Sequence, residues 1–233
     1  MTCRDLYFAY MEHAFWLLKD NFARLLKGNV QGRQQDSVGA TYYSKASINY
    51  PDISLDFCAT ASQVERQFRA FTFRQYQLPQ LNGINLRAAL ITTNKSRLKP
   101  GVLVKEKRDR FIVATLDYDI ELSKDYLSEA LNRIRSNDDI LDLLKLIPDV
   151  DELGPNGWNA LMVAAYCNNE SAAQELIQNG ADVNAFNCNG TSVLMYAKDG
   201  AENCGDSSTF RLLLENNANP EHRDSRGLSV YDY

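Results

Sequence analysis

The stretch Gly157–Leu161, GWNAL, returns 33 residues later as Gly190–Leu194, GTSVL, and this recurrence decides the fold of the C-terminal part of the chain. Asp149–Asp151, DVD, returns at the same spacing as Asp182–Asn184, DVN. A fixed period of this length indicates a repeat array, in which a helix pair cannot bury its apolar face alone and stacks on its neighbours. Such an array presents a binding surface. The fold and function of the residues ahead of it therefore have to be inferred separately.

The first copy resembles an ankyrin repeat closely, with GWNALMVAA at 157–165 and LIQNGADVNA at 176–185. A second copy covers Gly190–Pro220, and a partial copy at Gly227–Tyr233 is expected to cap the stack. The glycine returns after 37 residues in the second copy, four more than in the first. We expect these residues, around 199–208, to form a longer loop between its two helices.

Composition and charge indicate a folded cytoplasmic protein. The chain is 45% apolar and 24% charged, which is ordinary for globular proteins, and its net charge of −5 argues against bulk nucleic-acid binding. Residues 1–27 are broken by charges, so they predict neither a signal peptide nor a membrane span. With only His13 and His222 beside them, five scattered cysteines predict free thiols and no metal site: Cys3, Cys58, Cys167, Cys188 and Cys204.

Ahead of the repeats, the pattern predicts an α+β fold. Residues 3–27 place apolar side chains at near-helical spacing and end at Gly28, and residues 60–72 predict a second helix with Thr60 or Ser62 as its cap. Short β-rich runs at 84–92, 101–105, 110–117 and 119–122 predict a small antiparallel sheet or partial barrel. Helices at 127–134 and 138–147 lead into the repeats, so we expect domains at 1–123 and 124–233.

The order of elements in residues 1–123 resembles the C-terminal part of the folate-dependent formyltransferase family. The matching segments are a long helix at 6–26, ATYY at 40–43, VERQFRAF at 64–71, KPG at 99–101 and FIVAT at 111–115. The resemblance implies that residues 1–28 form the last helix of a catalytic domain. RQYQLP at 74–79 and the appended ankyrin array resemble the sugar N-formyltransferases more than the initiator-tRNA enzymes.

This resemblance implies a reaction that the chain itself lacks the residues to catalyse. The family moves a formyl group from N10-formyltetrahydrofolate to an amine, for the sugar enzymes that of a dTDP-linked amino-dideoxy sugar in O-antigen and lipopolysaccharide synthesis. Its catalytic Asn, His and Asp lie on an N-terminal domain, with the His in an Asn-x-His segment, and neither His13 nor His222 has that context. We therefore expect an inactive C-terminal fragment without catalytic residues, cofactor or metal, which retains dimerisation and nucleotide-sugar binding.

Trp158 is the leading candidate for the binding site of a dTDP-type nucleotide sugar. It occupies the variable position after the repeat's glycine, which in ankyrin stacks commonly faces the concave groove. Aromatic faces accept bases at roughly 1–3 kcal/mol per stack, whereas the alternative is that Trp158 covers the end of the 138–147 helix. Tyr196 and Lys198 are expected to flank it, and Lys198 or Arg223 to meet the pyrophosphate.

Three residues of the N-terminal part are candidates for contact with the catalytic domain: Tyr42, Tyr43 and Arg74. Aromatic pairs in β-rich segments are usually packing residues, so the alternative for the two tyrosines is that they pack within their own domain. Arg66, Arg69 and Arg74 either hold a phosphate or form a solvated helical face. Two other functions remain open, an ankyrin module that binds a protein partner and a tRNA formyltransferase-like fragment, which would need a basic face on the small domain.

Overall fold

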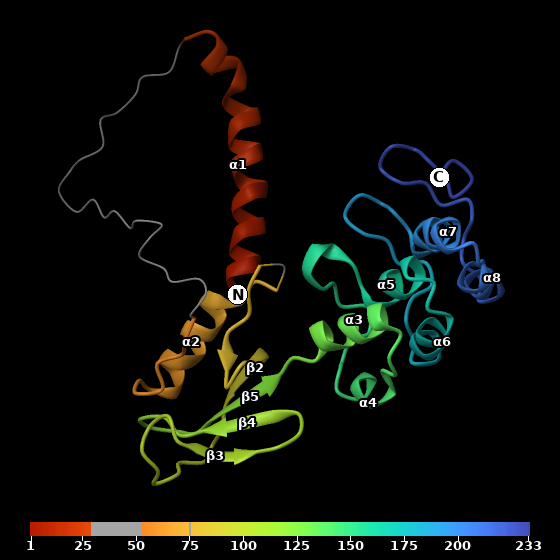
Figure 1. The fold of residues 1–233 in the computed structure, drawn as a ribbon. Helices are drawn as coiled ribbons and strands as arrows, with labels where there is room; N and C mark the ends of the chain where they lie inside the picture. The colour runs from red at the N-terminus through yellow and green to blue at the C-terminus, as the bar shows by residue number, and fades with distance from the viewer. Residues whose placement is uncertain (29–52, 75) are drawn as a thin grey trace. The chain divides into compact units, whose positions relative to one another are not determined.

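The structure, a computed structural model, describes residues 1–28, 53–74 and 76–233. By residue contacts the chain forms two units, one of residues 1–73 and 77–123 and the other of residues 74–76 and 124–233. The first unit holds the sheet and the second the repeats (Figure 1). The prediction of an α+β fold with an appended helical array is thereby confirmed.

The first unit begins with the long helix α1, Cys3–Leu26. The Thr2 hydroxyl accepts a hydrogen bond from the Asp5 amide while the Asp5 carboxylate accepts one from the Thr2 amide, a reciprocal cap that fixes the start of the helix. Gly28, with φ of 67°, follows the last turn and takes the left-handed conformation that suits glycine after a helix. None of the α1 side chains is buried among the described residues, although many of them are apolar.

A five-stranded sheet with a covering helix forms the core of this unit. Helix α2, Ala61–Phe71, starts at Thr60 as predicted. The strands are β1 Gln80–Leu81, β2 Ile84–Ile91, β3 Leu103–Glu106, β4 Arg110–Val113 and β5 Ile120–Lys124, in the order β1-β2-β5-β4-β3. Pairing is antiparallel between β1 and β2, β3 and β4, and β4 and β5. The core lies between sheet and helix and includes Val64, Phe68, Leu86, Phe111 and Leu122.

One strand prediction is corrected by a hydrogen bond to a side chain, and one short strand was not predicted. The strand predicted at 110–117 stops at Val113 because the residues after it turn towards α2, where the Asp117 carboxylate accepts a hydrogen bond from the Ala61 amide at 2.7 Å. Carboxylates stabilise helix N-termini in this way, so Asp117, at the end of the predicted strand, caps α2. The two-residue strand β1 is too short for its pattern to be recognised in the sequence.

The second unit is a stack of helix pairs (Figure 1). The pairs are α3 Leu127–Ser136 with α4 Leu141–Leu144, α5 Ala160–Tyr166 with α6 Glu170–Gln178, and α7 Val193–Cys204 with α8 Ser208–Glu215. The short 3-10 turn η2, Pro155–Gly157, precedes α5. Helix α5 packs on both α3 and α7, and one apolar cluster from Leu127 to Val230 runs through the stack. Neighbouring pairs therefore share one core, as the repeat predicts.

The extra residues of the second copy lengthen a helix, so our prediction of a longer loop was wrong. Helix α7 has 12 residues where α5 has 7. The loops that follow them, residues 167–169 and 205–207, are equally long. Helix α7 continues until Gly205, whose φ of 74° ends it in the left-handed region. In this repeat the helix gains more than a turn while the loop that follows it keeps its length.

Gly200 lies where α7 crosses α5 most closely. A Cβ atom at this position would lie 2.5 Å from the Ala165 carbonyl oxygen and 2.7 Å from that of Tyr166. Both contacts are with backbone, which cannot move aside as a flexible side chain does. Glycine is thus required by the approach of the two helices and not by its own backbone conformation.

We predict that Gly200→Ala destabilises the array. Alanine normally favours a helix interior over glycine by about 1 kcal/mol, but here the overpacking should outweigh that gain and lower the free energy of unfolding by about 1–3 kcal/mol. Urea unfolding followed by circular dichroism measures the change. Gly205→Ala is the matched control, because its Cβ would meet no atom within 4 Å and only the positive φ opposes it, at about 1 kcal/mol. A stabilised Gly200→Ala protein would contradict the close approach.

Candidate functional site

Three aromatic rings gather on the inner helices of the repeats, and we call Trp158, Tyr166 and Tyr196 the aromatic cluster. Trp158 precedes α5, Tyr166 ends α5 and Tyr196 lies in α7. The Trp158 ring centroid lies 4.4 Å from that of Tyr196 and 5.4 Å from that of Tyr166. Tyr196 is only 7% exposed, while Tyr166 is 41% exposed and Trp158 half-buried. The cluster therefore rests on the core and reaches the surface.

The residues around Trp158 hold it at the entrance to α5. The Asn159 side chain accepts a hydrogen bond from the Met162 amide at 2.9 Å and so caps the helix. The same side chain donates to the Asp151 carboxylate at 3.1 Å. The Trp158 carbonyl accepts from the Gly154 amide at 2.9 Å. The backbone on both sides of the indole is thus fixed before any ligand arrives.

Tyr196 is held by a residue of the neighbouring turn. The Asn187 side-chain amide donates to the Tyr196 hydroxyl at 2.7 Å, and the Asn187 side-chain oxygen Oδ1 accepts from the Asn189 and Thr191 amides. Burial raises the pKa of Tyr196, and the hydrogen bond from Asn187 only partly offsets it. Tyr196 is therefore a neutral phenol at physiological pH, suited to packing and hydrogen bonding but not to accepting protons in catalysis.

The two predicted cations already bind carbonyl oxygens of the chain. The Lys198 ammonium donates to the Tyr233 carbonyl oxygen at 2.7 Å and lies 3.7 Å from the Glu202 carboxylate. Lys198 also lines a hollow of about 380 Å³ with Ala201, Glu202, Phe210 and residues 205–207. The Arg223 guanidinium donates to the Gly227 carbonyl oxygen at 2.7 Å. Trp158 and Tyr196 are thus brought together, whereas the described contacts of Lys198 and Arg223 lie at the last repeat.

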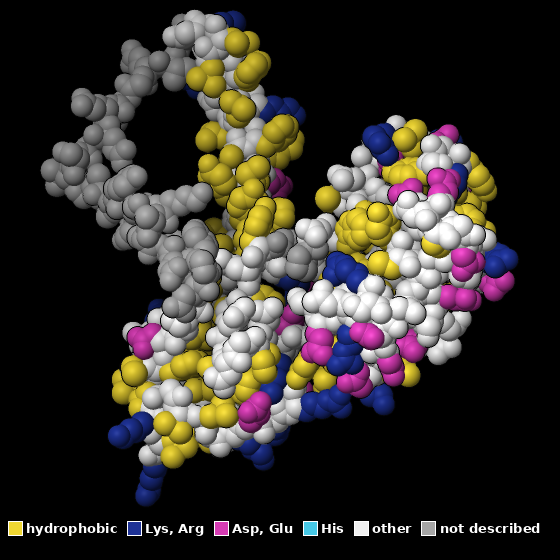
Figure 2. Space-filling view, in the orientation of Figure 1, with side chains coloured by type: hydrophobic (Ala, Val, Ile, Leu, Met, Phe, Trp, Pro, Cys, Tyr) yellow, Lys and Arg dark blue, Asp and Glu magenta, His cyan; other side chains and the backbone are white. Residues whose placement is uncertain are grey.

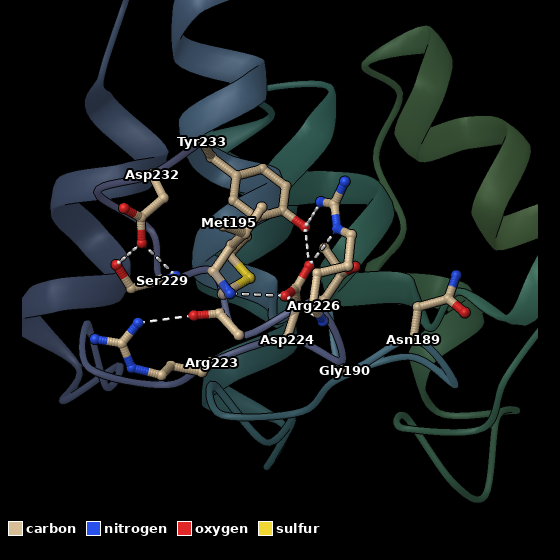
Figure 3. A network of polar contacts seen from close by, with 12 residues as sticks. Asn189, Gly190, Met195, Arg223, Asp224, Arg226, Ser229, Asp232 and Tyr233 are labelled. Carbon is tan, nitrogen blue, oxygen red and sulfur yellow. Dashed lines mark hydrogen bonds and ion pairs between the residues drawn. The ribbon is translucent and has the colours of Figure 1, made fainter.

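A polar network around Asp224 closes this last repeat (Figure 3). The Asp224 carboxylate accepts from the Tyr233 hydroxyl at 2.9 Å and from the Arg226 guanidinium at 3.0 Å. It also accepts from the amides of Arg226 and Leu228, both at 2.9 Å. Burial disfavours the charge of Asp224, but these hydrogen bonds outweigh it and lower its pKa to about 2. The irregular end of the array is stabilised by a carboxylate that must stay ionised.

Arg74 lies in the repeat unit, although it follows the sheet's covering helix in sequence. Its guanidinium pairs with Asp125 at 2.7 Å and with Glu152 at 2.7 Å. The Asp125 side chain is only 2% exposed, so Arg74 neutralises a buried charge. Tyr42 and Tyr43 lie outside the described residues. Arg69, from the same predicted group of cations, pairs with Glu65 one helical turn away at 2.6 Å.

The sequence analysis missed Tyr166 and Asn187. Tyr166 ends α5 eight residues after Trp158, but Trp158 precedes this helix with an extended backbone, so no helical spacing signalled their contact. Asn187 belongs to a turn, where asparagine is common for local reasons, so its contact with Tyr196 had no signal. Phe186, 58% exposed, stacks on His222 with ring centroids 5.2 Å apart and adds an aromatic surface at the repeat turns.

Neither a metal site nor a membrane span is found in the described part of the chain. Within residues 1–28, 53–74 and 76–233, no three His, Cys, Asp or Glu side chains gather as metal ligands would. No helix in those ranges has both the length and the hydrophobicity to cross a bilayer. The aromatic cluster offers ring stacking and hydrogen bonding.

Comparisons with known proteins find both ankyrin repeats and formyltransferases. Residues 127–224 match the family model of ankyrin repeats in three copies. A methionyl-tRNA formyltransferase from Ureaplasma parvum is 33% identical over 110 residues, 46% of this chain and 34% of that protein. A putative ankyrin repeat-containing protein from Treponema pallidum is 36% identical over 85 residues, 36% of this chain and 27% of that protein.

Among solved structures, the N-formyltransferase from Helicobacter canadensis in complex with folinic acid and dTDP-3-aminofucose is 27% identical. The match covers 53% of this chain and 45% of that one, with a TM-score of 0.44. The chain spans about a third of the length of the curated formyltransferase that it matches.

We predict that the array loses stability between about pH 4 and pH 2. Asp224 has a folded-state pKa of about 2 against an ordinary 3.8, so the unfolded chain binds the proton first as the pH falls. The contribution of Asp224 is thus complete above its unfolded pKa and lost as the pH approaches 2. Urea midpoints of the wild-type protein and Asp224→Asn should differ clearly at pH 6 and converge towards pH 2. A difference that stays constant over this range would contradict the assignment.

Proposed function

We propose that this chain, a formyltransferase-like region joined to ankyrin repeats, is the accessory part of a nucleotide-amino-sugar N-formyltransferase and that its repeats bind the nucleotide of such a sugar. The parent reaction would transfer a formyl group from N10-formyltetrahydrofolate to the amine of a dTDP-linked amino-dideoxy sugar, for O-antigen synthesis. The chain by itself is proposed to be inactive. Catalysis would need an acid–base group and oxyanion donors, and in the family that this chain resembles the Asn-x-His segment belongs to an N-terminal domain, whereas His13 and His222 have no such context.

The aromatic cluster is the observation that carries this proposal. Its rings come from two successive repeats and rest on one core, so a base could stack without reorganising the helices. Trp158 is half-buried and Tyr166 remains 41% exposed, which combines a rigid support with an open face. The pyrophosphate would then have to draw Lys198 or Arg223 away from the carbonyl oxygens that they now bind.

We predict that dTDP changes the fluorescence of Trp158. The chain has two tryptophans, so Trp16→Phe leaves Trp158 as the sole indole emitter. Titrating this variant with dTDP should quench or shift the emission, and calorimetry gives the affinity. Trp158→Ala should weaken binding between about 5-fold and about 150-fold, because one stack contributes roughly 1–3 kcal/mol. Thymidine should compete, since the rings would hold the base.

Two controls separate binding from folding. Trp158→Phe keeps an aromatic face and should retain most of the affinity, while Tyr231→Ala removes an exposed ring elsewhere in the same unit. Thermal unfolding of each variant verifies that the array is intact. If dTDP at millimolar concentration leaves both the emission and the heat of mixing unchanged, the nucleotide proposal fails. The repeats would then be better explained as a surface for a protein partner.

A second candidate, a tRNA formyltransferase-like fragment, is favoured by the charge of the small domain and by the sequence relative from Ureaplasma parvum. Residues 95–110 hold seven Lys or Arg against two Asp or Glu, although the whole chain is acidic. Lys99, Lys105 and Lys107 are exposed in and beside the edge strand β3. Figure 2 shows basic side chains projecting from this part of the molecule. A local basic face can attract phosphates despite an acidic total charge.

We predict that, if this second function holds, removing the three lysines weakens tRNA binding. The triple change Lys99→Ala, Lys105→Ala and Lys107→Ala should lower affinity and flatten its salt dependence, by up to about 0.9 in log–log slope per lost phosphate contact. The control removes as many exposed cations from the repeats: Arg135→Ala, Lys145→Ala and Arg211→Ala. Filter binding at several salt concentrations measures the affinity of each variant for tRNA and its salt dependence. Equal losses in the two variants would exclude a specific role for the β3 face.

A further inference from the structure

Asp199 of α7 is a half-buried carboxylate without a hydrogen-bond partner among the described residues. The adjacent Lys198 directs its ammonium to the Tyr233 carbonyl oxygen at 2.7 Å and lies 3.7 Å from the Glu202 carboxylate. Burial raises the pKa of Asp199, the charge of Glu202 adds to this rise, and Lys198 only partly offsets it. A charge that is partly removed from water without a partner costs the folded repeat free energy.

Several observations place Asp199 beside the aromatic cluster. It stands three residues after Tyr196 in α7, and residues at this spacing share one side of a helix. It occupies the repeat position that Tyr166 holds 33 residues earlier. The next residue, Gly200, approaches the Tyr166 backbone so closely that a Cβ would lie 2.7 Å from the Tyr166 carbonyl oxygen. The charge of Asp199 also contributes to the raised pKa of Tyr196. The carboxylate therefore borders the rings.

The length of α5 separates the indole from the level of the carboxylate. Trp158 precedes the first residue of α5, whereas Tyr166, at the level of Asp199, is its last. The 7 residues of α5 rise by about 10 Å, at roughly 1.5 Å per residue. In a nucleotide sugar the base and the sugar are joined through a diphosphate with several rotatable bonds. A base held at Trp158 thus leaves the sugar free to reach Asp199.

The chemistry beside the rings selects a positively charged group. An ionised carboxylate forms its strongest hydrogen bonds with charged donors, and aromatic faces such as that of Tyr166 also attract cations. The base and the diphosphate of a nucleotide offer Asp199 no positive charge. The amine of an amino sugar does, because aliphatic amines are largely protonated at neutral pH. Formylation removes this charge, since the nitrogen becomes part of a neutral amide.

We propose that Asp199 binds the ammonium group of the nucleotide-linked amino sugar, so that the repeats hold the unformylated sugar more tightly than its formylated product. This inference rests on the proposed function, because it needs a nucleotide at Trp158. Stacking on the rings recognises the base alone and is the same for both sugars. Asp199 adds the discrimination between them, and the accessory part then retains the substrate of formyl transfer and releases the product.

Calorimetric titration of the full chain with dTDP, dTDP-3-aminofucose and the N-formyl derivative of that sugar tests the inference. The wild-type chain should bind the amino sugar about tenfold more tightly than the formyl derivative, because hydrogen bonds between charged groups are the stronger ones. Asp199→Asn keeps the shape of the side chain and should abolish this preference, whereas dTDP should bind no more weakly. Glu215→Gln, which removes an exposed carboxylate from α8 of the same repeat, is the matched control and should retain the preference.

Thermal unfolding separates a binding role of Asp199 from a structural one. Asp199→Asn should unfold no earlier than the wild-type chain, because it removes a partly desolvated charge that has no partner. A lower unfolding temperature, or equal losses of affinity for all three ligands, would assign the residue to the fold and overturn the inference. If dTDP binds but the amino sugar has no advantage over its formyl derivative, the inference fails and the proposed function stands. If none of the three ligands binds, both fail.

Discussion

The contact between α5 and α7 is the constraint on which the candidate site depends. Gly200 lets the two inner helices approach until only a hydrogen atom fits between its Cα and the carbonyl oxygens that end α5. That approach brings Tyr196 of α7 to within ring contact of Trp158, just ahead of α5. Since packed interiors respond to a single methyl group, the geometry of the rings is set by a backbone contact that lies one helical turn after Tyr196 on α7 and at Tyr166 itself on α5.

Sequence reasoning recovered most of the architecture because the repeat has its own signature. The 33-residue period identified the helix pairs, and caps such as Thr60 and Asn159 follow the expected chemistry of helix starts. Both resemblances, to ankyrin repeats and to formyltransferases, are supported by the comparisons. The fold class was therefore accessible without coordinates.

The two errors of the fold prediction, and the open question at Lys198, arose where one residue type serves two purposes. Asp117 looks like part of a strand by alternation, but its carboxylate caps α2 from 56 residues away in sequence. The extra length after Asp199 has the polar character of a loop, yet it continues α7 because Gly205 alone supplies the stop. Lys198 has the charge for a phosphate contact but already binds the Tyr233 carbonyl oxygen. Long-range partners of this kind leave no local pattern.

The longer α7 has a consequence for how such an array can change. Ala201 and Glu202 of its last turns line a hollow together with Phe210 of α8. A regular repeat has no counterpart of this turn. Insertions of one helical turn can thus create new concave surface while the loops and the stack remain as they were. The side chains that line this hollow can therefore change in evolution without a change in the packing of the helices.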